Sequence, residues 1–213
     1  MFNLLYEITE DGIIHQKIAN IIQYDVDYIN DRYTKYGYLN DEMSYLRIGF
    51  LLGSIKEKIN KILDVGYGNG SFLKISKTMI KECSGYDISG FELPDNIIKA
   101  NNIYEDSYDV VCFFDVLEHL ENIEVIKNLK TKYIYISVPW CHFFSEDWFM
   151  NWKHRRYNEH LWHFNDKSLD TFMNRMGYVR ITNTENIEDS IRKTDFNYPN
   201  ILTCIYKNNN KYD

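Results

Sequence analysis

The segment KILDVGYGNGSF, residues 61–72, limits the possible folds of this chain more than any other stretch. It begins as a short apolar strand that carries Asp64 near its end, and it continues into three alternating glycines, Gly66, Gly68 and Gly70. Glycines at that spacing let the backbone turn tightly and approach a ligand without a Cβ in the way. Amide groups at the start of the following helix then point at a polar or anionic group. A strand, a glycine turn and a helix in this order are typical of nucleotide-binding α/β folds.

The composition narrows the class of protein. Of the 213 residues, 45% are hydrophobic and 16% aromatic, which is enough to fill the core of one domain. The net charge of −7 argues against nucleic acid as a partner, because a broad nucleic-acid interface needs a dominant basic face. The chain starts without the basic residues of a signal peptide and has no apolar run of roughly 18–20 residues, so we expect a cytoplasmic protein with no membrane partner. Its cysteines form no CxxC pair and are expected to be reduced: Cys83, Cys112, Cys141 and Cys204.

From residue 59 onward, short apolar strands alternate with helical segments, which predicts parallel βαβ units. The predicted strands are Lys61–Val65, Glu82–Tyr86, Tyr108–Phe114, Tyr133–Val138, Tyr178–Asn183 and Ile201–Lys207. The predicted helices are Ser71–Ile80, Ile123–Leu129 and Ser168–Met176, the last with Asn165 or Asp166 as its N-cap and Gly177 just after its end. Because the last two strands follow each other without a helix of normal length, we expect them to pair as an antiparallel hairpin at the edge of the sheet.

Residues 1–58 have helical spacing and predict an N-terminal helical cap, which ends in a helix over Asp41–Lys58. Between its helical parts lie the tyrosines Tyr24, Tyr28, Tyr33, Tyr36 and Tyr38. These tyrosines are compatible with a lid over a ligand, with a packed flank and with a homodimer surface.

Two acidic residues end neighbouring predicted strands. Asp87 follows the second strand, 23 positions after Asp64. A carboxylate about 20 residues past a glycine turn is placed to accept both hydroxyls of an adenosine ribose. The turn lacks the GxGxxG spacing of a dinucleotide site, and no second nucleotide-binding half follows, so the sequence favours a single adenosine without a pyrophosphate.

With these residues in place, the chain resembles the class I S-adenosylmethionine (SAM)-dependent methyltransferases, in particular the small-molecule branch with a D-x-L-E-H-L signature. The resemblance rests on ILDVGYGNGSFL, GYDIS, YDVVCFFDVLEHL, YIYISVPW and EHLWHFNDKSLDTFMNRMGY. It covers residues 59–207, and it implies a Rossmann-like α/β fold with a mostly parallel, seven-stranded sheet and helices on both faces. Residues 208–213 are expected to be a frayed tail.

The resemblance also implies which residues contact SAM. Asp64, Gly66 and Gly68 would hold the methionine end, and Asp87 would bind the ribose. Ile88, Asn102 and Ile103 would contact the adenine. Phe114 and Asp115, at the end of the fourth strand, would close the site. The interval from Asp87 to Tyr108 is shorter than the family pattern and contains Pro94, so we expect a reduced or missing helix there.

The segment 140–164 follows the fifth predicted strand and would face the acceptor as a substrate-side insertion. It holds aromatic and basic side chains that suit a small anionic acceptor, such as one carrying phosphate, carboxylate or a nucleotide sugar: Trp140, His142, Arg155, Arg156 and His160. The alternative is that these side chains are only the core and the solvated face of an insertion.

Methyl transfer depends mainly on positioning, and a base is needed only where the acceptor must lose a proton. His119 and His142 are the candidate bases, although His119 could instead anchor its helix. A zinc site of Cys141, His142, His160 and His163 is a further alternative, but the spacing matches no common tetrahedral pattern, so no metal is predicted.

The sequence therefore predicts a SAM-dependent methyltransferase that acts on oxygen or nitrogen of a small anionic acceptor, with a sugar or nucleotide-linked metabolite as the first choice. A nucleic-acid or protein methyltransferase and a SAM-fold module without catalysis are the alternatives.

Overall fold

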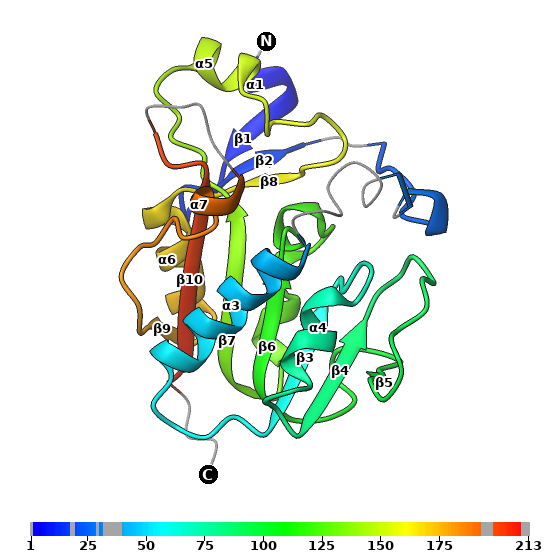
Figure 1. The fold of residues 1–213 in the computed structure, drawn as a ribbon. Coiled ribbons are helices and arrows are strands. Elements are labelled where there is room, and N and C mark those ends of the chain that lie inside the picture. Colours follow the sequence, from blue (N-terminus) through cyan, green and yellow to red (C-terminus); the bar gives the residue numbers. More distant parts are fainter. Residues whose placement is uncertain (1, 18–19, 29, 32–39, 193–197, 210–213) are drawn as a thin grey trace.

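A computed structural model describes residues 2–17, 20–28, 30–31, 40–192 and 198–209. Its main sheet has seven strands in the order β5-β4-β3-β6-β7-β10-β9, which confirms the predicted Rossmann-like class (Figure 1). The strands are β3 (Lys61–Val65), β4 (Glu82–Tyr86), β5 (Ile98–Lys99), β6 (Tyr108–Phe114), β7 (Thr131–Pro139), β9 (Tyr178–Arg180) and β10 (Ile201–Asn208).

Strands β5, β4, β3, β6 and β7 are parallel, so their carboxyl ends meet at one edge of the sheet. Strand β10 runs antiparallel beside β7, with Ile201 opposite Pro139, and β9 pairs with the outer side of β10. The expected antiparallel hairpin is therefore present. Helix α7 (Asp189–Arg192) lies between its two strands in sequence and close to the carboxyl end of β7 (Figure 1).

Helices cover both faces of the sheet. One face packs against α3 (Asn40–Ser54) and α4 (Ser71–Ser76), whose Leu51 and Leu73 are fully buried with Cys112 of β6. The other face packs against the 3₁₀ helix η3 (Ile123–Asn128) and α6 (Asp166–Arg175). The predicted Asn165 cap is confirmed as a capping box with Ser168.

The N-terminal segment differs from the helical prediction. Beyond α1 (Phe2–Leu5), residues 6–16 form an antiparallel hairpin of β1 (Tyr6–Ile8) and β2 (Ile14–Gln16). The helical expectation is wrong here because β2 also pairs with β8 (Trp162–His163), a partner that helical spacing does not reveal. The predicted Tyr33, Tyr36 and Tyr38 lie outside the described residues.

Several predicted elements are shorter than expected. Helix α3 ends at Ser54 rather than Lys58, and α4 ends at Ser76 rather than Ile80. The interval after Asp87 contains no helix and only the two-residue β5, which agrees with the expected reduction. None of the described helices is long and apolar enough to cross a membrane.

The segment 140–164 forms its own small core above the sheet. Its helix α5 (Glu146–Asn151) buries Phe149 against Phe2 and Tyr6 of the N-terminal segment. Cys141 joins this cluster. The insertion and the N-terminal hairpin are thus one structural unit at the carboxyl edge (Figure 1).

Candidate active site

The glycine turn lies at the carboxyl end of β3 and adopts the left-handed backbone that its glycines permit. The φ angles of Gly66, Gly68 and Gly70 are 70°, 56° and 74°. The Gly66 amide donates to Tyr86 O at 2.7 Å, which joins the turn to the end of β4. The turn therefore holds its backbone close to the neighbouring strand ends.

Asp87 connects the turn to the loop after β4. Its Oδ2 accepts from the Gly68 amide at 2.9 Å, and its Oδ1 accepts from the Ser89 amide at 2.8 Å. A carboxylate oxygen accepts more than one hydrogen bond, so both oxygens keep capacity for ligand hydroxyls. Next to it, Ile88 is 68% exposed and offers an apolar surface at the same edge.

Asp64 carries an unsatisfied carboxylate under the glycine turn. It is 3% exposed, and its Oδ1 has no hydrogen-bond partner among the described residues. Burial raises its pKa to about 8, with Arg47 acting in the opposite direction and the Asp87 charge adding to the rise. A buried acceptor without a donor fits a cationic or hydrogen-bonding ligand group, such as the ammonium of SAM.

The predicted adenine-edge residues lie on the loop that follows β5. Asn102 is exposed, and its Oδ1 accepts from the Tyr104 amide at 2.8 Å. Ile103 is partly buried and packs against the core on the η3 side of the sheet. Since β5 is parallel to β4, this loop leaves the sheet at the same edge as Asp87.

At the end of β6, Asp115 belongs to a network of charges. Its carboxylate pairs with Arg192 and lies 3.6 Å from Arg47 Nη2. Both arginines also hold Glu188, which is fully buried, with Arg47 Nε 2.7 Å from Glu188 Oε1 and Arg192 Nη2 2.7 Å from Oε2. Burial would raise the pKa of Asp115, but Arg192 and Arg47 outweigh it and lower that pKa to about 2. Phe114, which is also predicted to close the site, precedes Asp115 at the end of β6. The Arg47 guanidinium lies 4.2 Å from the centre of the Phe114 ring.

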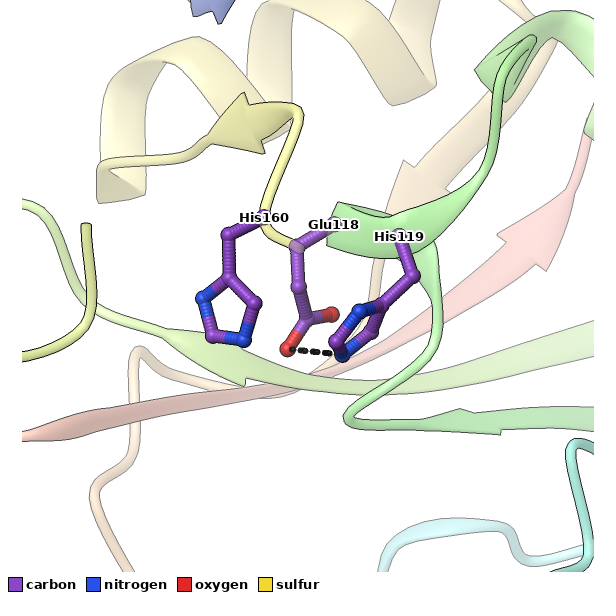
Figure 2. A group of neighbouring side chains, drawn as sticks. All are labelled: Glu118, His119 and His160. Carbon is purple, nitrogen blue, oxygen red and sulfur yellow. Dashed lines mark ion pairs between the residues drawn. The ribbon is translucent and has the colours of Figure 1, made fainter. Parts of the chain in front are cut away.

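The D-x-L-E-H-L segment, Asp115–Leu120, contains the 3₁₀ helix η2 (Leu117–His119). The side chains of Glu118 and His119 on this helix lie next to that of His160 (Figure 2). Glu118 is 1% exposed, and neither carboxylate oxygen has a hydrogen-bond partner among the described residues. His119 Nδ1 lies 2.9 Å from Glu159 O and 2.7 Å from the Tyr24 hydroxyl. A carbonyl only accepts, so the contact with Glu159 O favours the proton on Nδ1 and the lone pair on Nε2, with the Tyr24 hydroxyl accepting at Nδ1 as well.

A pocket of about 640 Å³ opens beside these groups. Ile88 lines one part, His119 and the following residues line another, and Tyr24 of the N-terminal segment contributes a further wall. The pocket thus joins the loop after β4 to the loop after β6.

Two of the predicted acceptor residues are partly buried and contact neighbouring parts of the chain. His142 is stacked between Trp140 and Phe144, and its Nε2 lies 2.7 Å from Pro199 O. Arg155 Nη1 donates to the Tyr6 hydroxyl at 3.1 Å. Neither His142 nor Arg155 lines the pocket beside His119.

Arg156 and His160 lie closer to the pocket residues. Arg156 Nη1 donates to Glu159 Oε1 at 2.7 Å, and the His160 ring centre is 4.6 Å from that of His119. Burial is the main cause that lowers the pKa of His160 well below its ordinary value, so it is neutral.

The alternative zinc set does not assemble. Among the described residues, only Glu118, His119 and His160 form a group whose ligand atoms could share a metal ion. Cys141 is buried, and His163 packs among the rings of Tyr6, Phe149 and Trp152.

Comparison with known proteins assigns the chain to a family. A family model described as a methyltransferase domain matches residues 37–183. The chain belongs to this methyltransferase family. No curated protein matches it in sequence.

Solved structures of SAM-dependent methyltransferases share the fold of this methyltransferase. One from Clostridium acetobutylicum is 10% identical with a TM-score of 0.56, and the match covers 83% of this chain and 98% of that one. One from Mesorhizobium loti is 14% identical with a TM-score of 0.55, covering 76% and 97%. Magnesium protoporphyrin IX methyltransferase from Synechocystis, with bound S-adenosylhomocysteine (SAH), is 12% identical with a TM-score of 0.55. The match covers 85% of this chain and 96% of that one. The chain is a class I methyltransferase whose cofactor is SAM.

Sequence reasoning missed the charged groups that surround the predicted site. Arg47 lies in α3 and Glu188 lies 141 residues later, so no local pattern connects them. Glu118 lies within the D-x-L-E-H-L segment, but its approach to His160 depends on the return of the chain through β8.

Proposed function

We propose that this methyltransferase transfers the methyl group of SAM to an oxygen or nitrogen atom of a small, anionic acceptor. The observation that carries the proposal is the pocket of about 640 Å³ that Ile88 and His119 line together. Its volume is in the range of small-molecule sites. Ile88, which follows Asp87, brings this pocket next to the proposed ribose site, so an acceptor in the pocket would lie beside the cofactor.

In this proposal, Asp64 and the backbone at Gly66 and Gly68 hold the methionine end of SAM, because Asp64 lacks an internal donor for Oδ1 among the described residues. Asp87 accepts the ribose hydroxyls. The exposed Ile88 covers one adenine face, with Asn102 and Ile103 at the adenine edge. Phe114 and Asp115 close the site at the end of β6.

The residues act mainly by positioning. Bound SAM supplies an electrophilic methyl group on a sulfonium, and the protein has to align the acceptor with it and exclude water. Tyr24 and its neighbours wall the pocket on the acceptor side, which supports a lid role for residues 21–25. His119 borders the pocket, so it is favoured over His142 as the group beside the acceptor atom.

The anionic character of the acceptor rests on the two arginines of the insertion, Arg155 and Arg156, which lie outside the pocket lining, whereas the lining itself carries Asp25 and Glu121. Arg156 pairs with the Glu159 carboxylate, and the backbone carbonyl of the same Glu159 contacts His119 at the border of the pocket. Arg155 forms no ion pair within the described part of the chain, and its guanidinium contacts Tyr6 and Tyr157. The DVLEHL segment, Asp115–Leu120, supports the small-molecule branch of the family.

Transfer from methyl-labelled SAM to metabolite fractions separated by charge tests the proposal. We expect label in the small anionic fraction, and a reduced rate with Arg156→Gln but not with Arg175→Gln, whose guanidinium pairs with Asp11 and Glu124. Label that enters only RNA, DNA or protein would contradict the proposed acceptor class.

A further inference from the structure

The cluster of Glu118, His119 and His160 has a chemistry that methyl transfer by positioning does not use. Figure 2 shows the Glu118 carboxylate between the two imidazole rings, with Glu118 and His119 on η2 and His160 on the loop before β8. One potential ligand atom from each residue lies within 4.8 Å of the others. The three groups therefore converge on one small volume.

Both imidazoles are oriented in the same way. His160 Nδ1 donates to His154 O at 2.7 Å, and His119 Nδ1 donates to Glu159 O at 2.9 Å. In each ring the lone pair is consequently on Nε2. A histidine that binds a metal typically donates its other ring N–H to a carbonyl or carboxylate, which fixes the ring and its tautomer.

The carboxylate in the cluster lacks a hydrogen-bond donor within the described part of the chain. Both Glu118 oxygens are buried without a partner, and His119 Nε2 is 3.9 Å from Oε1, too far for a hydrogen bond. Burial of an unpaired carboxylate is costly, and such groups in proteins are protonated, paired or bound to a metal. Bonds of about 2.0–2.2 Å to one tetrahedral ion would place these two atoms about 3.3–3.6 Å apart, so their 3.9 Å separation has to shorten by a few tenths of an ångström when an ion binds.

We propose that Glu118, His119 and His160 bind a divalent transition-metal ion. Two imidazole nitrogens and one carboxylate oxygen suit Zn²⁺, Mn²⁺, Fe²⁺ or Co²⁺, and three protein ligands leave positions open. His119 also lines the 640 Å³ pocket, so the ion borders the space for the acceptor. The role of the ion in catalysis rests on the proposed function. The ion would favour the deprotonated form of an acceptor hydroxyl, and His119 would be a metal ligand instead of a free base.

Metal titration of the chelator-treated full chain tests the site. We expect Zn²⁺ to bind with a stoichiometry of one in calorimetry, and Co²⁺ to give d–d absorption bands of a nitrogen- and oxygen-ligated ion. Losing the hydrogen-bond partner of a ligand costs about 10- to 100-fold in affinity, so Glu118→Gln and His160→Gln, which remove a ligand itself, should lose at least that much. His15→Gln is the control, because His15 stacks on Trp162 outside the cluster.

Near-UV circular dichroism and SAH binding establish that each variant is folded, and Glu118→Gln preserves the shape of the side chain. Failure of the folded wild type to bind Zn²⁺ or Co²⁺ would overturn the proposal, as would equal binding by wild type and Glu118→Gln. Because SAH binding is measured separately, a protein that binds SAH without metal would refute the metal site alone. Metal binding without SAH binding would instead refute the proposed cofactor site.

Discussion

Gly66 and Val116 lie so close that a Cβ built on Gly66 would be 2.4 Å from Val116 Cγ2. This contact joins the glycine turn after β3 to the loop after β6, the two segments between which we place the methionine end of SAM. The turn thus depends on glycine for space as well as for its backbone angle of 70°.

Gly66→Ala should therefore destabilise the protein and weaken SAH binding. A left-handed alanine costs about 1–2 kcal/mol, and the clash with Val116 adds about 1–3 kcal/mol. Gly90→Ala is the matched control, because Gly90 has a φ of 76° but a Cβ built there meets no atom within 4 Å. Urea unfolding of both variants measures the difference, and equal losses would show that the Val116 contact does not matter.

Gly49→Ala should stabilise the protein. Gly49 lies within α3, and a Cβ there meets nothing within 4 Å. Alanine is a better helix former than glycine by about 1 kcal/mol, which sets the expected gain in the free energy of unfolding. A loss of stability in thermal or urea unfolding would contradict the open surroundings of this position.

Arg47→Met should be strongly destabilising. Arg47 holds the fully buried Glu188 through Nε at 2.7 Å and Nη2 at 3.1 Å. Removing one partner of a buried ion pair costs about 3–5 kcal/mol, and because Arg192 still pairs with Glu188 we expect a loss near the lower end of this range. Arg175→Met is the control, because its pairs with Asp11 and Glu124 are partly exposed and such pairs contribute about 0–1 kcal/mol. Similar losses in the two variants would refute the importance of the buried network.

His163 should make stability depend on pH. Burial, with Arg155 adding to it, lowers the pKa of His163 from 6.5 to about 3, so the folded state holds this ring neutral. Protons therefore favour the unfolded state, and the contribution is fully present above about pH 6.5 and lost as pH falls toward 3. The slope is about 1.4 kcal/mol per pH unit for one proton.

His163→Phe should reduce that slope by one proton while the ring contacts with Phe149 and Tyr6 are kept. Urea unfolding at several pH values between about 4 and 7, below and above the unfolded pKa of histidine, measures the slope. An unchanged slope would show that His163 is already protonated in the folded protein.

The sequence predicts best what depends on neighbouring residues. Strands β3, β4 and β6 have the predicted bounds, because their apolar runs lie between clear turn residues. The hairpin of residues 6–16 has a local turn signal in Asp11 and Gly12, whose φ is 81°, but the pairing of Ile14 with His163, far away in sequence, is not visible locally. In the candidate site, the positions of Asp64 and Asp87 could be predicted because each lies at the end of a strand that the sequence predicts. The approach of His160 to Glu118 depends on the folded path of the insertion, which neighbouring residues do not reveal.

Calorimetric titration with SAH, on the wild type and on Asp87→Ala, tests the assignment of the cofactor site. A carboxylate that bonds the ribose should contribute roughly 1.5–3 kcal/mol, so the variant should bind about tenfold to a hundredfold more weakly. Asp106→Ala is the control, because Asp106 precedes β6 at the opposite edge of the sheet and pairs with Lys61. We expect SAH binding that only Asp87→Ala weakens. Equal binding by wild type and Asp87→Ala, or no binding by the folded wild type, would contradict the assignment.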